Sequence, residues 1–361
     1  MTGTTSAASD HRAAKEGAPA QSRVQDPPKA VVMPLVAATP WAYRVTEDAQ
    51  SSSVTSDASG IPQWLRDLQN SNWWQGFYHQ GEAFAAFLTD RGAGTLFVTF
   101  DANVSEARPR QAPNLWAHEV CRKNSWSQLE MLAFRLHWYR DQSVIDYLVG
   151  LKDDGFFDRF QRVVFAGLSM GGSAACAFAR LVPGCQVIAF SPQSTLSAQR
   201  VPWDRRFPAA GAVDWSGPFG DAAGHLDGAR QVHLIYDPQE PNDQRHAARL
   251  DGPNVTHLHA PHAGHKSSVR LLQARLLDAV VEQIVDGRCG QPEFRILYRQ
   301  ARLHPWYLDV IGQTLHRKQR GGLLQRVANF AASHNRPMVA RTLQAMADDL
   351  RRQPTRKGSN D

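Results

Sequence analysis

Cysteine is scarce in this sequence of 361 residues: only Cys121, Cys176, Cys185 and Cys289 occur, and no two have the spacing of a zinc ribbon. A disulfide scaffold and a structural zinc site are therefore disfavoured. We expect reduced thiols in a cytoplasmic protein. No apolar run approaches the roughly 18 residues that a membrane-spanning helix needs. Residues 1–28 also lack the apolar segment of a secretory signal.

Net charge is small as well, at +6, but its distribution along the chain is uneven. Residues 291–361 contain 13 Lys and Arg against 5 Asp and Glu, a balance of +8, so the preceding residues carry −2. A basic C-terminal region suits an acidic protein or an anionic surface as partner. No motif of interleaved aromatic and basic residues accompanies it, so nucleic-acid binding is not expected.

The chain has enough apolar material for a sizeable core, since hydrophobic residues make up 42% and charged residues 20%. Residues 1–60 are rich in Ser, Thr, Ala and Pro, which predicts a flexible tail with at most one strand, over 31–36. Tryptophan and other aromatic residues then become frequent from about residue 61. A folded unit is expected to begin there.

Between residues 61 and 288, short apolar runs alternate with helical patterns. Strands are predicted over 95–101, 128–134, 162–168, 186–190, 231–236 and 255–259, and helices over 141–151, 173–181, 246–250 and 266–285. This alternation predicts an α/β fold, with a mostly parallel sheet and helices on both faces. A small all-helical region follows over 289–350, with helices at 297–302, 306–316, 323–332 and 338–350. Residues 351–361 are expected to form a basic, disordered tail.

The strongest chemical signal is the pentapeptide Gly167-Leu-Ser169-Met-Gly171, which lies between a predicted strand and a predicted helix. A serine on such a sharp turn projects its Oγ from the sheet, and the flanking glycines leave room for the turn. The helix N-terminus that follows supplies N–H groups to a developing oxyanion. A turn that merely packs a helix closely on a sheet is the alternative interpretation.

A base and an acid follow in the chain order that such a nucleophile requires. His265 lies in the loop after the strand predicted at 255–259. The acid loop follows the strand at 231–236 and offers Asp237, Glu240 and Asp243. Asp237 directly follows the strand and is our first choice, whereas Asp243 also suits helix N-capping.

These three sites together resemble the α/β-hydrolase superfamily over about residues 63–285. The resemblance implies that Ser169 is the nucleophile, that His265 is the general base and that Asp237 orients it. It also implies an oxyanion hole built from the backbone N–H of Met170 and a second N–H near Asp101 or Ala102, where the usual His-Gly pattern is absent. No cofactor is needed for this chemistry.

Other residues carry weaker signals. His257, His259 and His262 cluster near His265, but no carboxylate or cysteine shares their run, so no metal site is expected. Cys176 is interpreted as a core residue.

Two further segments have two interpretations each. Residues 137–140 follow a predicted strand and either line a substrate pocket or pack in the core. Residues 191–230 hold aromatic residues and arginines, and form either a cover over a pocket or a surface loop.

The C-terminal helices resemble a tetratricopeptide-like hairpin, from Ala301 through His304-Pro305 and Tyr307 to Gly322 and Ala328. We therefore expect a serine esterase or acyltransferase that works through an acyl-enzyme on a glycan or small-molecule ester. The alternative is a non-catalytic adaptor in polysaccharide or envelope assembly, with the helical region as its binding surface. The sequence leaves open the substrate, the choice between hydrolysis and acyl transfer, and the oligomeric state.

Overall fold

The computed structural model describes residues 76, 78–101 and 117–352. The tail expected over 1–60, its candidate strand at 31–36 and Ala102 lie outside these residues. So do residues 353–361 of the expected basic tail. Residues 351–352, which were also assigned to that tail, instead form the last residues of a helix, α12.

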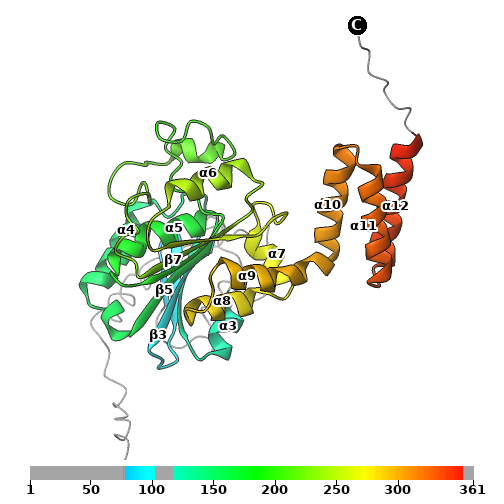
Figure 1. Ribbon diagram of the computed structural model, residues 1–361. Helices are drawn as coiled ribbons and strands as arrows, with labels where there is room; N and C mark the ends of the chain where they lie inside the picture. Colours follow the sequence, from blue (N-terminus) through cyan, green and yellow to red (C-terminus); the bar gives the residue numbers. More distant parts are fainter. Residues whose placement is uncertain (1–75, 77, 102–116, 353–361) are drawn as a thin grey trace, which may run out of the picture.

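One eight-stranded sheet is the centre of the fold (Figure 1), with the strand order β1-β2-β4-β3-β5-β6-β7-β8. The strands are β1 Tyr78–Gln80, β2 Phe84–Thr89, β3 Thr95–Asp101, β4 Ser127–Ala133, β5 Arg162–Leu168, β6 Gln186–Phe190, β7 Gln231–Tyr236 and β8 Val255–His259. The first three strands in this order pair antiparallel, and every other pair is parallel. All six predicted strands are present; β1 and β2 were not predicted.

Helices cover both faces of the sheet, as predicted. The helices of the described residues are α3 His118–Lys123, α4 Gln142–Asp153, α5 Met170–Phe178, α6 Pro241–Arg249, α7 Ser267–Gln273, α8 Leu277–Val285, α9 Gln291–Tyr298, α10 Pro305–Arg317, α11 Gly321–Ser333 and α12 Pro337–Arg352. Short 3-10 helices are η2 Phe157–Arg159, η3 Ala179–Leu181, η4 Pro208–Ala212 and η5 Arg299–Leu303. No helix in these described ranges is both long and apolar enough to cross a bilayer.

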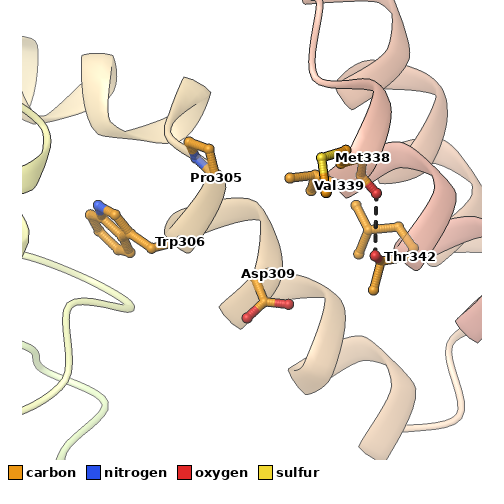
Figure 2. Close-up of a pocket in the computed structure, with 7 residues that line it drawn as sticks. Pro305, Trp306, Asp309, Met338, Val339 and Thr342 are labelled. Atoms are coloured by element: carbon orange, nitrogen blue, oxygen red, sulfur yellow. Dashed lines mark hydrogen bonds between the residues drawn. The ribbon is translucent and has the colours of Figure 1, made fainter.

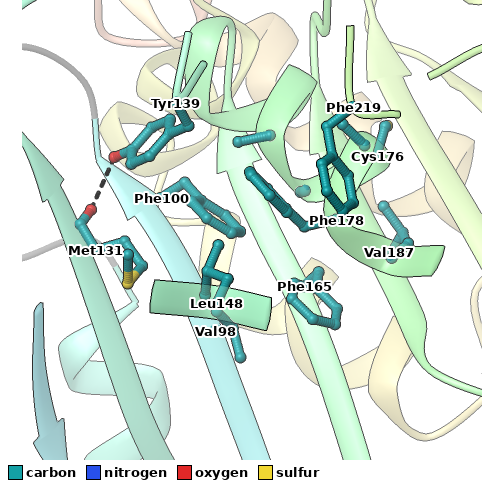
Figure 3. Close-up of a cluster of buried hydrophobic side chains, with 14 of the residues drawn as sticks. Val98, Phe100, Met131, Tyr139, Leu148, Phe165, Cys176, Phe178, Val187 and Phe219 are labelled. Carbon is teal, nitrogen blue, oxygen red and sulfur yellow. Dashed lines mark hydrogen bonds between the residues drawn. The ribbon is translucent and has the colours of Figure 1, made fainter. Parts of the chain in front are cut away.

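The two faces of the sheet bury two separate hydrophobic clusters, because successive side chains of a strand point to opposite faces. Val163 and Phe165 of β5 join one cluster, while Val164 and Ala166 join the other. Figure 3 shows the first cluster, in which Phe100 and Phe165 lie among side chains from α4 and α5. Because both faces of the sheet are buried, both sets of alternating side chains are apolar, and the central strands are apolar throughout.

The single helix predicted over 266–285 is interrupted. Arg275 has φ 58°, a left-handed conformation that ends α7 before α8 begins at Leu277. A left-handed residue closes a helix most easily when it is glycine. The sequence has no glycine there, so the break carried no local signal.

The C-terminal helices divide differently from the predicted border at residue 289. Phe294 and Tyr298 of α9 and Trp306 and Tyr307 of α10 belong to the second cluster of the sheet. A separate cluster of Leu308, Leu324, Ala328, Ala331, Leu343 and Ala347 joins α10, α11 and α12. Figure 1 shows these three helices, the C-terminal bundle, set apart from the sheet. The first residues of α10 therefore pack on the sheet, and the rest of α10 packs on α11 and α12. Helix α9 belongs to the core of the sheet.

Close backbone approach at the turn after β5 requires glycine. A Cβ on Gly171 would lie 2.1 Å from the backbone oxygen of Phe100 in β3, and one on Gly167 would lie 2.4 Å from the backbone of Gly171. Neither neighbour is the mobile end of a side chain. Strand β5, helix α5 and strand β3 therefore approach one another so closely that positions 167 and 171 have no room for a side chain larger than the hydrogen atom of glycine.

We predict that Gly171→Ala destabilises the protein by about 1–3 kcal/mol or more, because the new methyl group must displace backbone. Gly150→Ala is the matched control: it lies in α4, and a Cβ there meets nothing within 4 Å. That variant should be stabilised by about 0.4–1 kcal/mol. Urea unfolding of the two variants measures both effects, and equal stability of the pair would contradict the close-approach argument.

Candidate active site

Ser169 sits on a strained turn at the carboxyl end of β5. Its φ of 53° and ψ of −115° are unusual for a residue with a side chain. Its backbone N–H donates to the oxygen of Phe190 at 2.8 Å, which ties the turn to β6. Helix α5 begins at the next residue, Met170. The predicted strand, turn and helix around the serine are all present.

His265 lies against this serine. Its Nε2 is 2.8 Å from the Ser169 Oγ, although the two residues are 96 positions apart in the chain. The loop that carries His265 is held at two points: Gly264 donates its N–H to Asp237 at 2.9 Å, and the Tyr298 hydroxyl donates to the oxygen of Pro261 at 3.0 Å. Both contacts fix the backbone beside the imidazole.

The carboxylate beside His265 is that of Asp243, and the prediction of Asp237 is wrong on this point. Asp243 Oδ2 is 2.8 Å from His265 Nδ1. Asp237 instead accepts the N–H groups of Gln239 and Gly264, each at 2.9 Å. The physical reason is the start of α6: Glu240 is its N-cap and Pro241 its first residue. Asp243 therefore lies in the first helical turn and not at the cap.

Asp243 is buried, with none of its side chain exposed, and it is shared by two partners. Arg206 Nη1 donates to Asp243 Oδ1 at 2.7 Å. Burial raises the pKa of the Asp243 carboxyl, but hydrogen bonds and charge from His265 and Arg206 outweigh it, so the pKa is lowered. The carboxylate is thus ionised at neutral pH and fixes an Nδ1–H on His265. His265 Nε2 is then free to accept the proton of Ser169.

A second serine, histidine and aspartate network lies behind the first and was missed by the sequence analysis. Arg206 also binds Asp204, and Asp204 Oδ2 is 3.0 Å from Nε2 of the fully buried His246. His246 Nδ1 accepts the backbone N–H of Ser194 at 3.2 Å. Burial is the main influence on His246 and lowers its pKa, so this histidine is neutral. The network anchors Arg206, and through it the acid of the first group.

Gln193 is another residue that the sequence analysis did not identify. It follows β6, is fully buried, and its Nε2 is 3.1 Å from the Ser169 Oγ. Its Oε1 accepts from the indole N–H of Trp138 at 3.1 Å. A lone buried glutamine in a loop has no motif around it, so only the fold could place it beside the serine.

Residues 191–230 cover this site instead of folding on themselves as a surface loop. Phe207 lies 5.8 Å from the His265 ring, centroid to centroid, and Trp138 packs against Phe207 at 5.8 Å and Trp215 at 6.0 Å. Tyr139, by contrast, is a core residue whose hydroxyl donates to the backbone oxygens of Asp101 and Met131. Figure 3 shows the bond to Met131.

Two other residues of the 137–140 segment also have packing partners. The His137 ring lies 3.0 Å from the oxygen of Ala83. Arg140 donates to the backbone oxygens of Asp214 and Ser216 in the cover.

The oxyanion-hole candidates lie where the fold can use them. Met170 is the first residue of α5, so its N–H has no carbonyl one turn earlier in the helix. Asp101 ends β3, and β3 pairs with β5 in the register Phe100 to Gly167, next to the serine turn. The alternative second donor, Ala102, is outside the described residues.

The histidines of β8 contact a tyrosine. The Tyr236 hydroxyl lies 3.2 Å from His257 Nδ1 and 3.1 Å from His259 Nε2. Within residues 76, 78–101 and 117–352, no group of three or more His, Cys, Asp or Glu has an arrangement suited to a metal ion. All four cysteines are buried and free. The described residues near Ser169 offer hydrogen-bonding and aromatic groups to a ligand.

No protein-family profile and no curated protein sequence matches this chain. Among solved structures, a putative esterase from Staphylococcus aureus is 10% identical over 61% of this chain and 90% of that one, with a TM-score of 0.42. A capsule O-acetyltransferase of Neisseria meningitidis serogroup A is 11% identical over 60% and 99%, with a TM-score of 0.38.

A glycosylation-associated protein complex from Streptococcus agalactiae also resembles the chain, at 15% identity and a TM-score of 0.40. The match covers 58% of this chain and 45% of that one, so it spans less than half of that protein's length. An esterase from Pyrococcus furiosus and an alpha/beta hydrolase enzyme from a lagoon-sediment metagenome are also among the neighbours. The chain's own mostly parallel eight-stranded sheet, with helices on both faces, is the α/β architecture that the sequence predicted.

Proposed function

We propose that this protein is a serine hydrolase or acyltransferase that works through an acyl-enzyme on Ser169. The observation that carries the proposal is the continuous line of hydrogen bonds from Ser169 Oγ through His265 to Asp243, at 2.8 Å for each step. Nucleophile, base and orienting acid in mutual contact are the geometric signature of covalent acyl transfer.

The chemistry runs in two balanced steps. Ser169 Oγ attacks the acyl carbon and gives its proton to His265 Nε2, and His265 then passes this proton to the departing alcohol. Water or an acceptor hydroxyl next attacks the acyl-enzyme and gives its proton to His265. The bond from the acyl carbon to Oγ breaks, and Oγ takes that proton back. The backbone N–H groups of Met170 and of Asp101 or Ala102 are the proposed donors to the oxyanion.

The proposed substrate is an ester of a glycan or of a small molecule. Support comes from Phe207 of the cover, which lies 5.8 Å from the His265 ring, and from Trp138, which packs against both Phe207 and Trp215. Aromatic faces present large apolar surfaces to which the faces of sugar rings and acyl groups can pack. Water as acceptor gives hydrolysis, and a sugar hydroxyl gives transfer, with the same residues in the same roles.

We predict that Ser169→Ala abolishes labelling by a fluorophosphonate probe and lowers esterase activity by several orders of magnitude, since the nucleophile is lost. Thermal unfolding should be nearly unchanged, because one half-buried hydroxyl is removed. Ser143→Ala is the control: its hydroxyl is exposed on α4 and donates to the Asp141 carboxylate. It should still label. A wild-type protein that never labels would exclude the enzyme and leave the adaptor role.

A second prediction separates the acids. Asp243→Asn should lower kcat by roughly 10³–10⁴, because the amide no longer fixes the proton on His265 Nδ1. Asp237→Asn keeps a carbonyl oxygen for the Gly264 N–H, so its kcat should fall far less. Glu240→Gln should lower kcat only slightly. Nitrophenyl acetate hydrolysis measures all three. A larger loss at Asp237 than at Asp243 would show that another arrangement is the active one.

For the C-terminal bundle we propose a docking role for an acidic, amphipathic partner segment. A cavity of about 330 Å³ lies between α10 and α12 and is lined by Pro305, Trp306, Asp309, Met338, Val339, Thr342 and Leu343 (Figure 2). Met338 is 80% exposed, which is unusual for its type. One arginine contacts a lining residue, since Arg270 lies 5.0 Å from the Trp306 ring, and Arg336 and Arg341 lie close to Met338 in the sequence. Apart from Asp309 and Thr342 the lining is apolar, and an apolar groove with arginines nearby complements an acidic amphipathic helix.

We predict that a synthetic helix with Leu on one face and Glu on the other binds the full chain, and that Met338→Glu weakens this binding at least about tenfold. Leu323→Glu is the matched control, since Leu323 is 44% exposed on α11 and does not line the cavity. Fluorescence anisotropy at two salt concentrations measures both. Equal weakening by the two variants, or insensitivity to salt, would contradict the proposed site.

A further inference from the structure

The position of Gln193 allows a specific role in the reaction. The Ser169 hydroxyl has one hydrogen and two lone pairs. Since His265 Nδ1–H donates to Asp243, His265 Nε2 is an acceptor and takes the serine hydrogen. The remaining contact of the Oγ, 3.1 Å from Gln193 Nε2, is therefore an N–H donated to a serine lone pair.

The orientation of the Gln193 amide follows from its neighbours. The Trp138 indole N–H is a donor only, so the atom that lies 3.1 Å from it is the amide oxygen. The Ser173 hydroxyl lies 3.1 Å from the same oxygen and accepts the backbone N–H of Gln193 at 2.9 Å. With the oxygen held by Trp138, the NH₂ group must face Ser169. The other Nε2 hydrogen is directed to the oxygen of Ser191, 3.4 Å away.

A donor in this place acts most strongly when the Oγ carries negative charge. Charge builds on the Oγ as its proton leaves for His265, and again as its bond to the acyl carbon breaks in the second step. Hydrogen bonds to an ionised oxygen are roughly twice as strong as those to a neutral one. A buried, pre-oriented donor therefore stabilises both transition states more than the resting serine or the neutral acyl ester.

We infer that Gln193 is a catalytic residue of the acyl transfer, and that its side-chain amide stabilises the Ser169 Oγ as this atom attacks and as it departs. Trp138 is the positioning residue that fixes the amide. The inference rests on the proposed function, because it needs Ser169 to be the nucleophile. The role of Gln193 differs from that of the oxyanion hole, because the donors of the oxyanion hole bind the substrate oxygen and Gln193 binds the Ser169 Oγ.

The test uses the full chain and a fluorophosphonate probe, with the second-order rate constant of labelling as the readout. Gln193→Met removes the donor at similar length and should slow labelling by about 10–100-fold. Gln186→Met is the matched control, because Gln186 is also buried but begins β6, where it contacts Gln231 and Ile284. It should label at the wild-type rate.

Two further variants distinguish chemistry from packing. Gln193→Glu keeps the acceptor for Trp138 but, once ionised, has no donor for the Oγ. Its deficit relative to wild type should therefore shrink as the pH falls and the new carboxyl gains a proton, which a packing defect would not do. Trp138→Phe removes the indole donor together with one ring, leaves the Gln193 amide in place, and should give a smaller loss than Gln193→Met.

The outcomes separate the two proposals. If the wild type does not label, the proposed function fails and this inference fails with it. If the wild type labels and Gln193→Met labels equally fast, only the role of Gln193 is overturned. A deficit of Gln193→Glu that is constant with pH also overturns it, because the amide would then matter for packing alone. Slow labelling that still reaches the wild-type end point supports it.

Discussion

The buried carboxylate of Asp243 is the point on which the candidate site depends. It is fully removed from solvent and is held between a guanidinium and an imidazole. An isolated charge in such a place would be costly, whereas one with two charge-assisted hydrogen bonds is not. The three partners come from separate parts of the chain: Arg206 from the cover, Asp243 from α6 and His265 from the loop after β8. Folding of all three is needed before any one of them is stable in place.

The cover contributes to both ends of the triad. On the acid side, Arg206 links Asp243 to Asp204, and Asp204 links to the buried His246. On the nucleophile side, Gln193 holds the serine oxygen, one residue before Ser194, which His246 contacts. The segment after β6 thus forms a continuous polar layer under the aromatic side chains. It is a structural part of the site and not an appended loop.

Most of the sheet could be predicted from the sequence, because strands buried on both faces are continuous apolar runs. The nucleophile turn was also evident, since the Gly167-x-Ser169-x-Gly171 pattern is local. The acid could not be chosen from the sequence: Asp237, Glu240 and Asp243 all follow the same strand, and the start of α6 decides which one reaches His265. Gln193 carries no local pattern at all. Its contact with the serine exists only because β5 and β6 are neighbours.

The edges of the sheet show a consequence of the place of α9. At one edge, β1 is only three residues long, which limits the backbone that another strand could pair with. At the other edge, β8 has β7 as its one neighbour among the described strands, and α9 packs beside it. The side-chain oxygen of Gln291, the first residue of α9, accepts the N–H of His259 at 3.0 Å. Gln291 therefore occupies one hydrogen-bonding position of this edge strand, which leaves less of its backbone open to pairing with another chain.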